Sequence, residues 1–172
     1  IVSLVTDLAA AVREVVLPEL GAHAGRDHAG EAEGGDVTFV IDERAEARME
    51  EFLAERASGV AFYSEDRGMV SPSGSDAEWV LVVDPIDGTR PALAGLESCM
   101  VSVAAARLDG EPTMGDVEVG SMIEIKSGER FVAERGKGVE PAPRLSPNRE
   151  VERMLWTYGL RGRPARALME VL

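Results

Sequence analysis

The stretch that decides the fold of this chain is Trp-Val-Leu-Val-Val-Asp-Pro-Ile-Asp-Gly-Thr, at residues 79–89. Its apolar half predicts a buried strand. The carboxylates of Asp84 and Asp87 follow at once, and like charges at a strand end repel each other unless a cation lies between them. Gly88 lets the backbone approach a bound anion closely, and Thr89 adds a hydroxyl. These groups together are the ones that metal-assisted phosphoryl chemistry requires.

The composition indicates a globular chain with a large acidic excess. At 172 residues it can form one sizeable core, or one domain plus part of another. The net charge of −13 argues against nucleic acid and anionic membrane surfaces as partners. No apolar stretch approaches the roughly 20 residues that span a bilayer.

The chain contains one cysteine, Cys99, which lies in an apolar run. A single cysteine excludes an internal disulfide and is typical of a reducing compartment, so we expect a cytoplasmic protein. We expect Cys99 to be a small buried residue, not a nucleophile. The last segment stops within a helical pattern, so we also expect the fold to continue past Leu172.

The order of the predicted elements is two helices followed by several strands, which favours an α+β fold with a mainly antiparallel sheet. We expect Pro85 to end the strand that begins at Trp79, because proline lacks the N–H that a ladder needs. The predicted helices are 2–20 and 42–57, with helical or mixed segments at 149–156 and 164–172. The predicted strands are 37–41, 60–63, 79–83, 100–106, 117–125 and 130–133, and the predicted loops are 21–35, 67–78 and 136–147.

Acidic residues lie at the ends of three predicted strands, which could bring them to one edge of a single sheet. Each has an ordinary explanation taken alone: Asp42 would be the N-cap of the second helix, and the others could be loop or turn residues. Gathered together, they would raise one another's pKa values unless divalent cations were bound. Oxygen ligands without a Cys/His cluster favour Mg²⁺ over Zn²⁺. The acids are Asp36, Asp42, Glu65, Asp66, Asp84 and Asp87.

The motif Asp-Pro-Ile-Asp-Gly-Thr at residues 84–89 resembles the signature of the inositol monophosphatase family, which belongs to the Mg²⁺-dependent, lithium-sensitive sugar and nucleotide phosphatases. This motif is highly specific. Three weaker segments agree with the family in order and spacing, so the resemblance covers about residues 1–140. The continuation at 90–95 is more similar to bacterial and archaeal members. The weaker segments are 36–42, 62–66 and 131–138.

The resemblance implies a layered αβαβα sugar-phosphatase fold. Residues 1–140 would form an N-terminal α+β metal-binding domain, and residues 141–172 would begin a C-terminal α/β domain that is incomplete here. Relatives in the family usually form homodimers.

The resemblance also implies a metal site. Glu65, Asp84 and the backbone carbonyl of Ile86 would hold a first Mg²⁺, and Asp84 and Asp87 would hold a second. Asp66 would lie behind these ligands or hold the waters of a third, weaker ion.

The same resemblance implies the catalytic groups. Thr89 and Asp42 would orient and deprotonate a water bound to the metal, and that water would attack a phosphate monoester. The backbone N–H groups of Gly88 and Thr89 would hold a phosphate oxygen, helped by a helix that starts there.

Two features depart from the family pattern. Asp66 stands where the family has glutamate, and the later Trp-Asp-x-Ala-Ala-Gly segment, whose aspartate completes the second metal site, does not occur before Leu172. The substrate therefore stays open between an inositol monophosphate, fructose 1,6-bisphosphate, histidinol phosphate and 3′-phosphoadenosine 5′-phosphate. A catalytically weak metal-binding module is the alternative from a different class.

Overall fold

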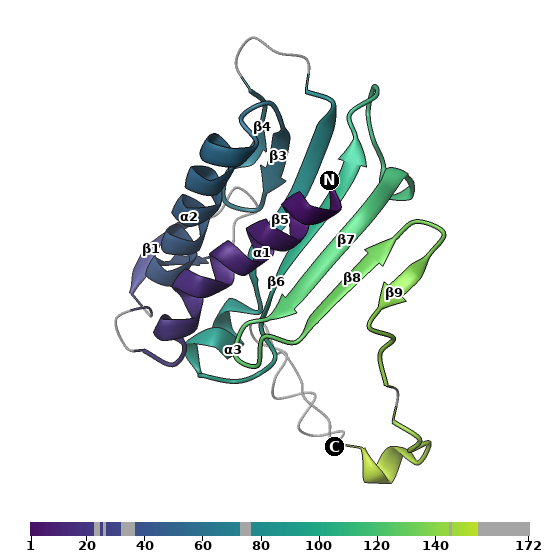
Figure 1. Cartoon of the computed structure of the whole chain (residues 1–172). Coiled ribbons are helices and arrows are strands. Elements are labelled where there is room, and N and C mark those ends of the chain that lie inside the picture. The colour runs from purple at the N-terminus through teal and green to yellow at the C-terminus, as the bar shows by residue number, and fades with distance from the viewer. Residues whose placement is uncertain (23–24, 26, 32–36, 73–76, 145, 155–172) are drawn as a thin grey trace.

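The computed structural model describes residues 1–22, 25, 27–31, 37–72, 77–144 and 146–154. Two helices, α1 and α2, lie across one face of a large twisted sheet (Figure 1). In chain order the elements are α1 (Val2–Val16), η1 (Leu17–Glu19), β1 (His28–Glu31), β2 (Val37–Phe39), α2 (Val40–Arg56), β3 (Ala61–Ser64), β4 (Gly68–Val70), β5 (Trp79–Asp87), α3 (Thr89–Leu93), β6 (Met100–Arg107), η3 (Met114–Asp116), β7 (Val117–Glu124), β8 (Arg130–Glu134), β9 (Gly138–Glu140) and η4 (Val151–Arg153).

The sheet has seven strands in the order β4-β3-β5-β6-β7-β8-β9, and β1 and β2 form a separate two-stranded sheet. Only β3 and β5 pair in parallel; the other neighbours are antiparallel. The predicted α+β class with a mainly antiparallel sheet is therefore confirmed. The parallel pair matters most for the site, because both of its strands end at the same edge.

The core lies between the two helices and the sheet. Val5, Leu8 and Val12 of α1 recur at helical spacing and are fully buried. Burying each such side chain contributes about 1.5–3 kcal/mol. Cys99 belongs to the same core and is 0% exposed, as predicted.

The opposite face of the sheet carries exposed apolar side chains. Tyr63, Val82 and Met122 are 45%, 43% and 41% exposed. They alternate with buried neighbours along their strands, as the two-residue period of a strand requires. The helices α1 and α2 both lie on the other side of the sheet (Figure 1).

The prediction that residues 37–41 form a strand and that Asp42 is the N-cap of the next helix is wrong. The strand ends at Phe39, and α2 begins at Val40. Asp42 is instead the third residue of the helix, and its Oδ2 accepts a hydrogen bond from the backbone N–H of Phe39 at 2.8 Å. This is the reciprocal bond of a capping box, so the carboxylate still satisfies an otherwise unpaired donor at the helix start.

Pro85 does not end its strand, contrary to expectation. β5 continues to Asp87, with a shift in pairing against β6 between Asp84 and Asp87. Proline is tolerated at such an irregularity, because the ladder needs no N–H there.

Three short strands occur in segments predicted as loops. They are β1, β4 and β9, each of three or four residues and each containing glycine. The segment predicted as helical at 149–156 contains the short η4, while its last two residues, the 164–172 segment and Asp36 lie outside the described residues. The proposed domain boundary at 140 stays a prediction.

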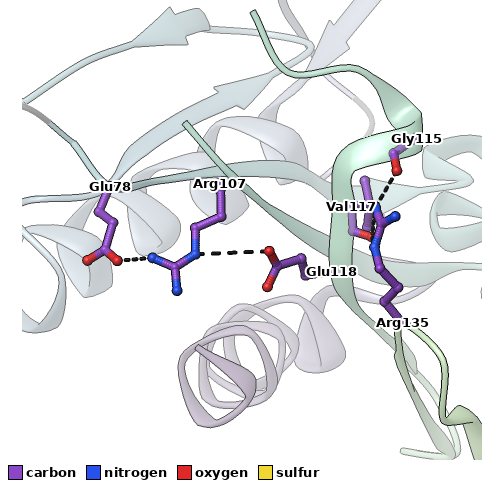
Figure 2. Close-up of polar contacts among 6 residues, drawn as sticks. All are labelled: Glu78, Arg107, Gly115, Val117, Glu118 and Arg135. Atoms are coloured by element: carbon purple, nitrogen blue, oxygen red, sulfur yellow. Dashed lines mark hydrogen bonds and ion pairs between the residues drawn. The ribbon is translucent and has the colours of Figure 1, made fainter. Parts of the chain in front are cut away.

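Two arginines lie at the end of the sheet where β5 begins (Figure 2). The Arg107 guanidinium lies 4.2 Å from the ring centre of Trp79 and forms ion pairs with Glu78 and, at 4.0 Å, Glu118. Arg135 donates to the backbone carbonyl of Gly115 in η3 and to that of Val117 at the start of β7. These cations are therefore at the end of β5 opposite the acidic motif.

No helix in the described part of the chain is long and apolar enough to cross a membrane.

Candidate active site

The parallel pairing of β3 and β5 brings two acidic segments together. Phe62 pairs with Leu81 and Tyr63 with Val82. Continuing this register past the last pair places Glu65 level with Asp84. Two segments that are distant in sequence thus present carboxylates at one edge of the sheet.

Asp84 is the most perturbed acid of this edge. The pKa of Asp84 is raised to about 6, first by burial and then by the negative charges of Asp87, Glu65 and Asp42, in that order of importance among the charges. A hydrogen bond from the backbone N–H of Ile86 to Oδ1 of Asp84, at 3.1 Å, opposes the shift. Four carboxylates are therefore near enough to influence one another, and a cation bound between them would relieve the repulsion.

Thr89 and Asp42 are joined by a direct hydrogen bond. Oγ1 of Thr89 lies 3.0 Å from Oδ1 of Asp42 and 3.2 Å from the carbonyl oxygen of Ile86. The hydroxyl has one proton, so it donates to one of these acceptors at a time. Burial raises the pKa of Asp42, while its hydrogen bonds from Phe39 and Thr89 lower it. The predicted catalytic pair is thus in contact, with the acid fixed through both oxygens.

Asp42 reaches the site by a route that differs from the prediction. It was expected to end a strand of the same sheet, but β2 belongs to the small separate sheet and Asp42 lies in the first turn of α2. The helix therefore delivers this carboxylate from the covered face of the sheet. Glu65, Asp84 and Asp87 lie at the same edge of the sheet, their role as metal ligands stays a prediction, and the route by which Asp42 reaches the site is corrected.

Gly88 holds the turn between the strand and α3. Its φ of +90° is a conformation that other residues rarely adopt, and a Cβ at this position would lie 2.6 Å from the carbonyl oxygen of Ser98. The short helix α3 begins directly afterwards, as predicted, and the N–H of Ala92 donates to the Gly88 carbonyl at 3.0 Å. Only glycine fits this turn, which fixes Asp87 and Thr89 on either side of it.

The candidate metal ligands at this edge of the sheet are all oxygen atoms. In the described part of the chain, no three His, Cys, Asp or Glu side chains are arranged, as they stand, to hold a metal ion. Glu65 and Asp87 are exposed, however, and exposed carboxylates can change rotamer at low cost. The chemistry of the set fits Mg²⁺, because every candidate ligand is an oxygen and the acids repel one another. To share an ion with Asp84, Glu65 and Asp87 would each have to turn toward it.

The acidic edge opens onto the uncovered face of the sheet. A hollow of about 430 Å³ is lined by Glu65 and Asp84 together with apolar residues of neighbouring strands, including Tyr63, Val82 and Met122. The candidate site is therefore accessible from this side within the described part of the molecule.

Two residues near the acids were missed by the sequence analysis. Thr38 donates through Oγ1 to Oδ1 of Asp66 at 2.8 Å, which places Asp66 against β2. Glu46 is 2% exposed, although glutamate is rarely buried. The signal for Glu46 was its helical spacing: it follows Asp42 by four residues and so lies on the same face of α2.

The comparisons with known proteins agree with this architecture. Inositol-1-monophosphatase of Aeropyrum pernix is 35% identical over 109 residues, which are 63% of this chain and 39% of that protein. The fructose-1,6-bisphosphatase/inositol-1-monophosphatase of Methanothermobacter thermautotrophicus is 27% identical, over 96% of this chain and 63% of that protein. The bifunctional NADP phosphatase/NAD kinase of Methanococcus maripaludis is 31% identical over 49% of this chain and 17% of that protein.

Solved structures show the same fold. A crystal structure titled inositol monophosphatase-fructose 1,6-bisphosphatase has a TM-score of 0.65 at 24% identity, covering 80% of this chain and 50% of that one. The Thermotoga maritima IMPase has a TM-score of 0.62 at 21% identity, covering 85% of this chain and 53% of that one. The chain thus spans about half the length of these structures. The sequence model of the inositol monophosphatase family matches residues 1–157, and the chain belongs to that family.

Proposed function

We propose that this chain carries the metal-binding and water-activating part of a Mg²⁺-dependent phosphatase that hydrolyses a small phosphate monoester. The observation that carries the proposal is the Thr89–Asp42 hydrogen bond beside the carboxylates of Asp84 and Glu65. Membership of the inositol monophosphatase family supports the same reaction class.

Glu65, Asp84 and the Ile86 carbonyl are the proposed ligands of a first Mg²⁺, and Asp84 and Asp87 those of a second. Bound there, Mg²⁺ would neutralise the charge that develops on the attacking and leaving oxygens. The raised pKa of Asp84 supports this assignment, because a carboxyl group that is costly to ionise alone gains most from a neighbouring cation.

Proton transfer is assigned to Thr89 and Asp42. Asp42 accepts the hydroxyl proton of Thr89, whose oxygen can then take a proton from the attacking water. The water oxygen forms a bond to phosphorus as the bond to the leaving alcohol breaks, and the alcohol oxygen takes a proton from solvent. Asp42 supplies the basicity that a threonine hydroxyl lacks. The backbone N–H groups of Gly88 and Thr89 are the proposed donors to a phosphate oxygen.

The substrate class follows from the relatives only as far as small phosphate esters. The relatives are named for inositol phosphate, fructose 1,6-bisphosphate and NADP phosphatase activities. We place inositol monophosphate first, because the family match and several of these names agree on it. The homodimer and the cytoplasmic location stay predictions.

The test is phosphate release by the full-length protein. Inositol 1-phosphate, fructose 1,6-bisphosphate, NADP⁺ and an aryl phosphate are each assayed with Mg²⁺ and with a chelator. We expect turnover of at least one substrate with Mg²⁺ and none with the chelator. Asp87→Asn should abolish turnover with the fold intact, whereas Asp109→Asn, the same change at an exposed position outside the site, should not. Absence of Mg²⁺-dependent turnover on all four would contradict the proposal and favour a metal-binding module.

A further inference from the structure

Glu46 is a buried acid whose carboxylate is only partly satisfied by hydrogen bonds. Its side chain is 2% exposed, and its Oε2 atom accepts no hydrogen bond from the described residues. Burial raises its pKa to about 7. An unpaired buried carboxyl group destabilises the fold, so a residue of this kind calls for a role that offsets its cost.

Glu46 belongs to a line of three acids on one face of α2. Asp42, Glu46 and Glu50 follow one another at intervals of four residues, so they lie one helical turn apart. Asp42 accepts from Thr89, and Glu50 pairs with Arg67 through Oε1 and Nε at 2.8 Å. Asp42 and Glu50 are thus each bound to a segment that carries candidate metal ligands.

The partner of Glu46 is Ser64, the last residue of β3. The Ser64 side chain lies near enough to the Glu46 carboxylate to lower its pKa, and the Ser64 oxygen accepts a hydrogen bond from the backbone N–H of Arg67 at 3.2 Å. Ser64 is 0% exposed, so solvent does not compete for these interactions. The hydroxyl therefore ties the turn that contains Glu65 and Asp66 to the rigid helix.

Behind this turn lies a small cavity of about 130 Å³. Glu46, Thr38, Asp66 and Arg67 are among the residues that line it. Thr38 of β2 holds Asp66 by a hydrogen bond, and Glu46 of α2 faces the same turn from the buried side. The turn is therefore fixed by two elements.

We propose that Glu46 is a positioning residue, which acts through the Ser64 hydroxyl to hold Glu65 where it can bind the first Mg²⁺. This inference rests on the proposed function. Outer residues that orient a metal ligand typically change metal affinity by about 10–100-fold when removed. Loss of the Glu46 carboxylate should therefore weaken Mg²⁺ binding by a factor in this range.

The test is Mg²⁺ titration calorimetry on the full-length protein and two variants of Glu46. Glu46→Leu keeps the volume but removes the acceptor, and should raise the Kd for Mg²⁺ about tenfold or more. The melting temperature should not fall, since a buried carboxyl group with one unsatisfied oxygen is replaced by an apolar side chain. Glu46→Gln keeps an acceptor for Ser64 and should retain affinity within a few-fold. Glu55→Gln, on the exposed side of the same helix, is the control and should match wild type.

Ser64→Ala provides an independent route to the same answer. It should weaken Mg²⁺ binding as Glu46→Leu does, and the double variant should be no weaker than either single one. A wild-type Kd in both Glu46→Leu and Ser64→Ala would overturn the inference and leave the proposed function standing. If Glu46→Leu does not fold, Ser64→Ala alone decides. Failure of the wild-type protein to bind Mg²⁺ would overturn the proposed function and this inference with it.

Discussion

Replacing Gly88 by alanine tests the geometry on which the site depends. The new Cβ would lie 2.6 Å from the Ser98 carbonyl oxygen, and the residue would have to keep a φ of +90°. The left-handed conformation costs about 1–2 kcal/mol for a non-glycine residue. Relieving the contact requires a backbone shift, which typically adds about 1–3 kcal/mol.

Gly110→Ala is the matched control, because Gly110 has a φ of +72° but no atom within 4 Å of a new Cβ. It carries the conformational cost without the contact. We expect Gly88→Ala to melt below Gly110→Ala by about 2–4 °C for each additional kcal/mol. Differential scanning calorimetry of both variants measures this difference. Equal melting temperatures would refute the close approach of Gly88 to Ser98, and with it the described turn between Asp87 and Thr89.

The remaining predictions concern charge and catalysis. Burial raises the pKa values of Asp84 and Glu46 to about 6 and about 7, so the folded protein holds protons that the unfolded chain releases. With a chelator present, the free energy of unfolding should therefore fall as the pH rises from about 4 to about 7. Calorimetry should show a shallower fall for Asp84→Asn than for the wild-type protein. An unchanged slope would contradict the raised pKa of Asp84. Asp42→Asn and Thr89→Ala should each lower kcat by about 10²–10⁴-fold with native circular dichroism, and near-normal kcat in either would refute the proton-transfer pair. Arg107→Gln should lower the melting temperature by about 1–4 °C through loss of its ring contact and leave kcat unchanged, and a large loss of activity would contradict its distance from the site.

The strongest predictions came from segments where one physical signal dominates. Leu81 and Val83 of the apolar run before Asp84 pack in the core beneath the helices, and the hydrophobicity of this run alone identified the strand. The helix α1 was evident because its core positions recur at helical spacing. Thr89 and Asp42, which the family resemblance named together, are joined by a hydrogen bond, and their catalytic role stays a prediction.

The errors came from segments whose structure depends on distant partners. Val40 and Ile41 are β-branched and suit a strand, but the capping bond between Asp42 and Phe39 starts the helix two residues earlier. β4 forms because β3 offers it an edge, which a three-residue segment cannot signal by itself. Glu46 was missed because nothing in the sequence shows that Ser64 will lie opposite it.

The proposed function depends on carboxylates from separate segments sharing Mg²⁺ at the end of β5. Anomalous diffraction from crystals of the full-length protein soaked in Mn²⁺, a substitute that accepts the same oxygen ligands, tests it directly. We expect an anomalous peak within coordination distance of both Glu65 and Asp84. A peak bound by only one of them, or none at this edge of the sheet, would contradict it.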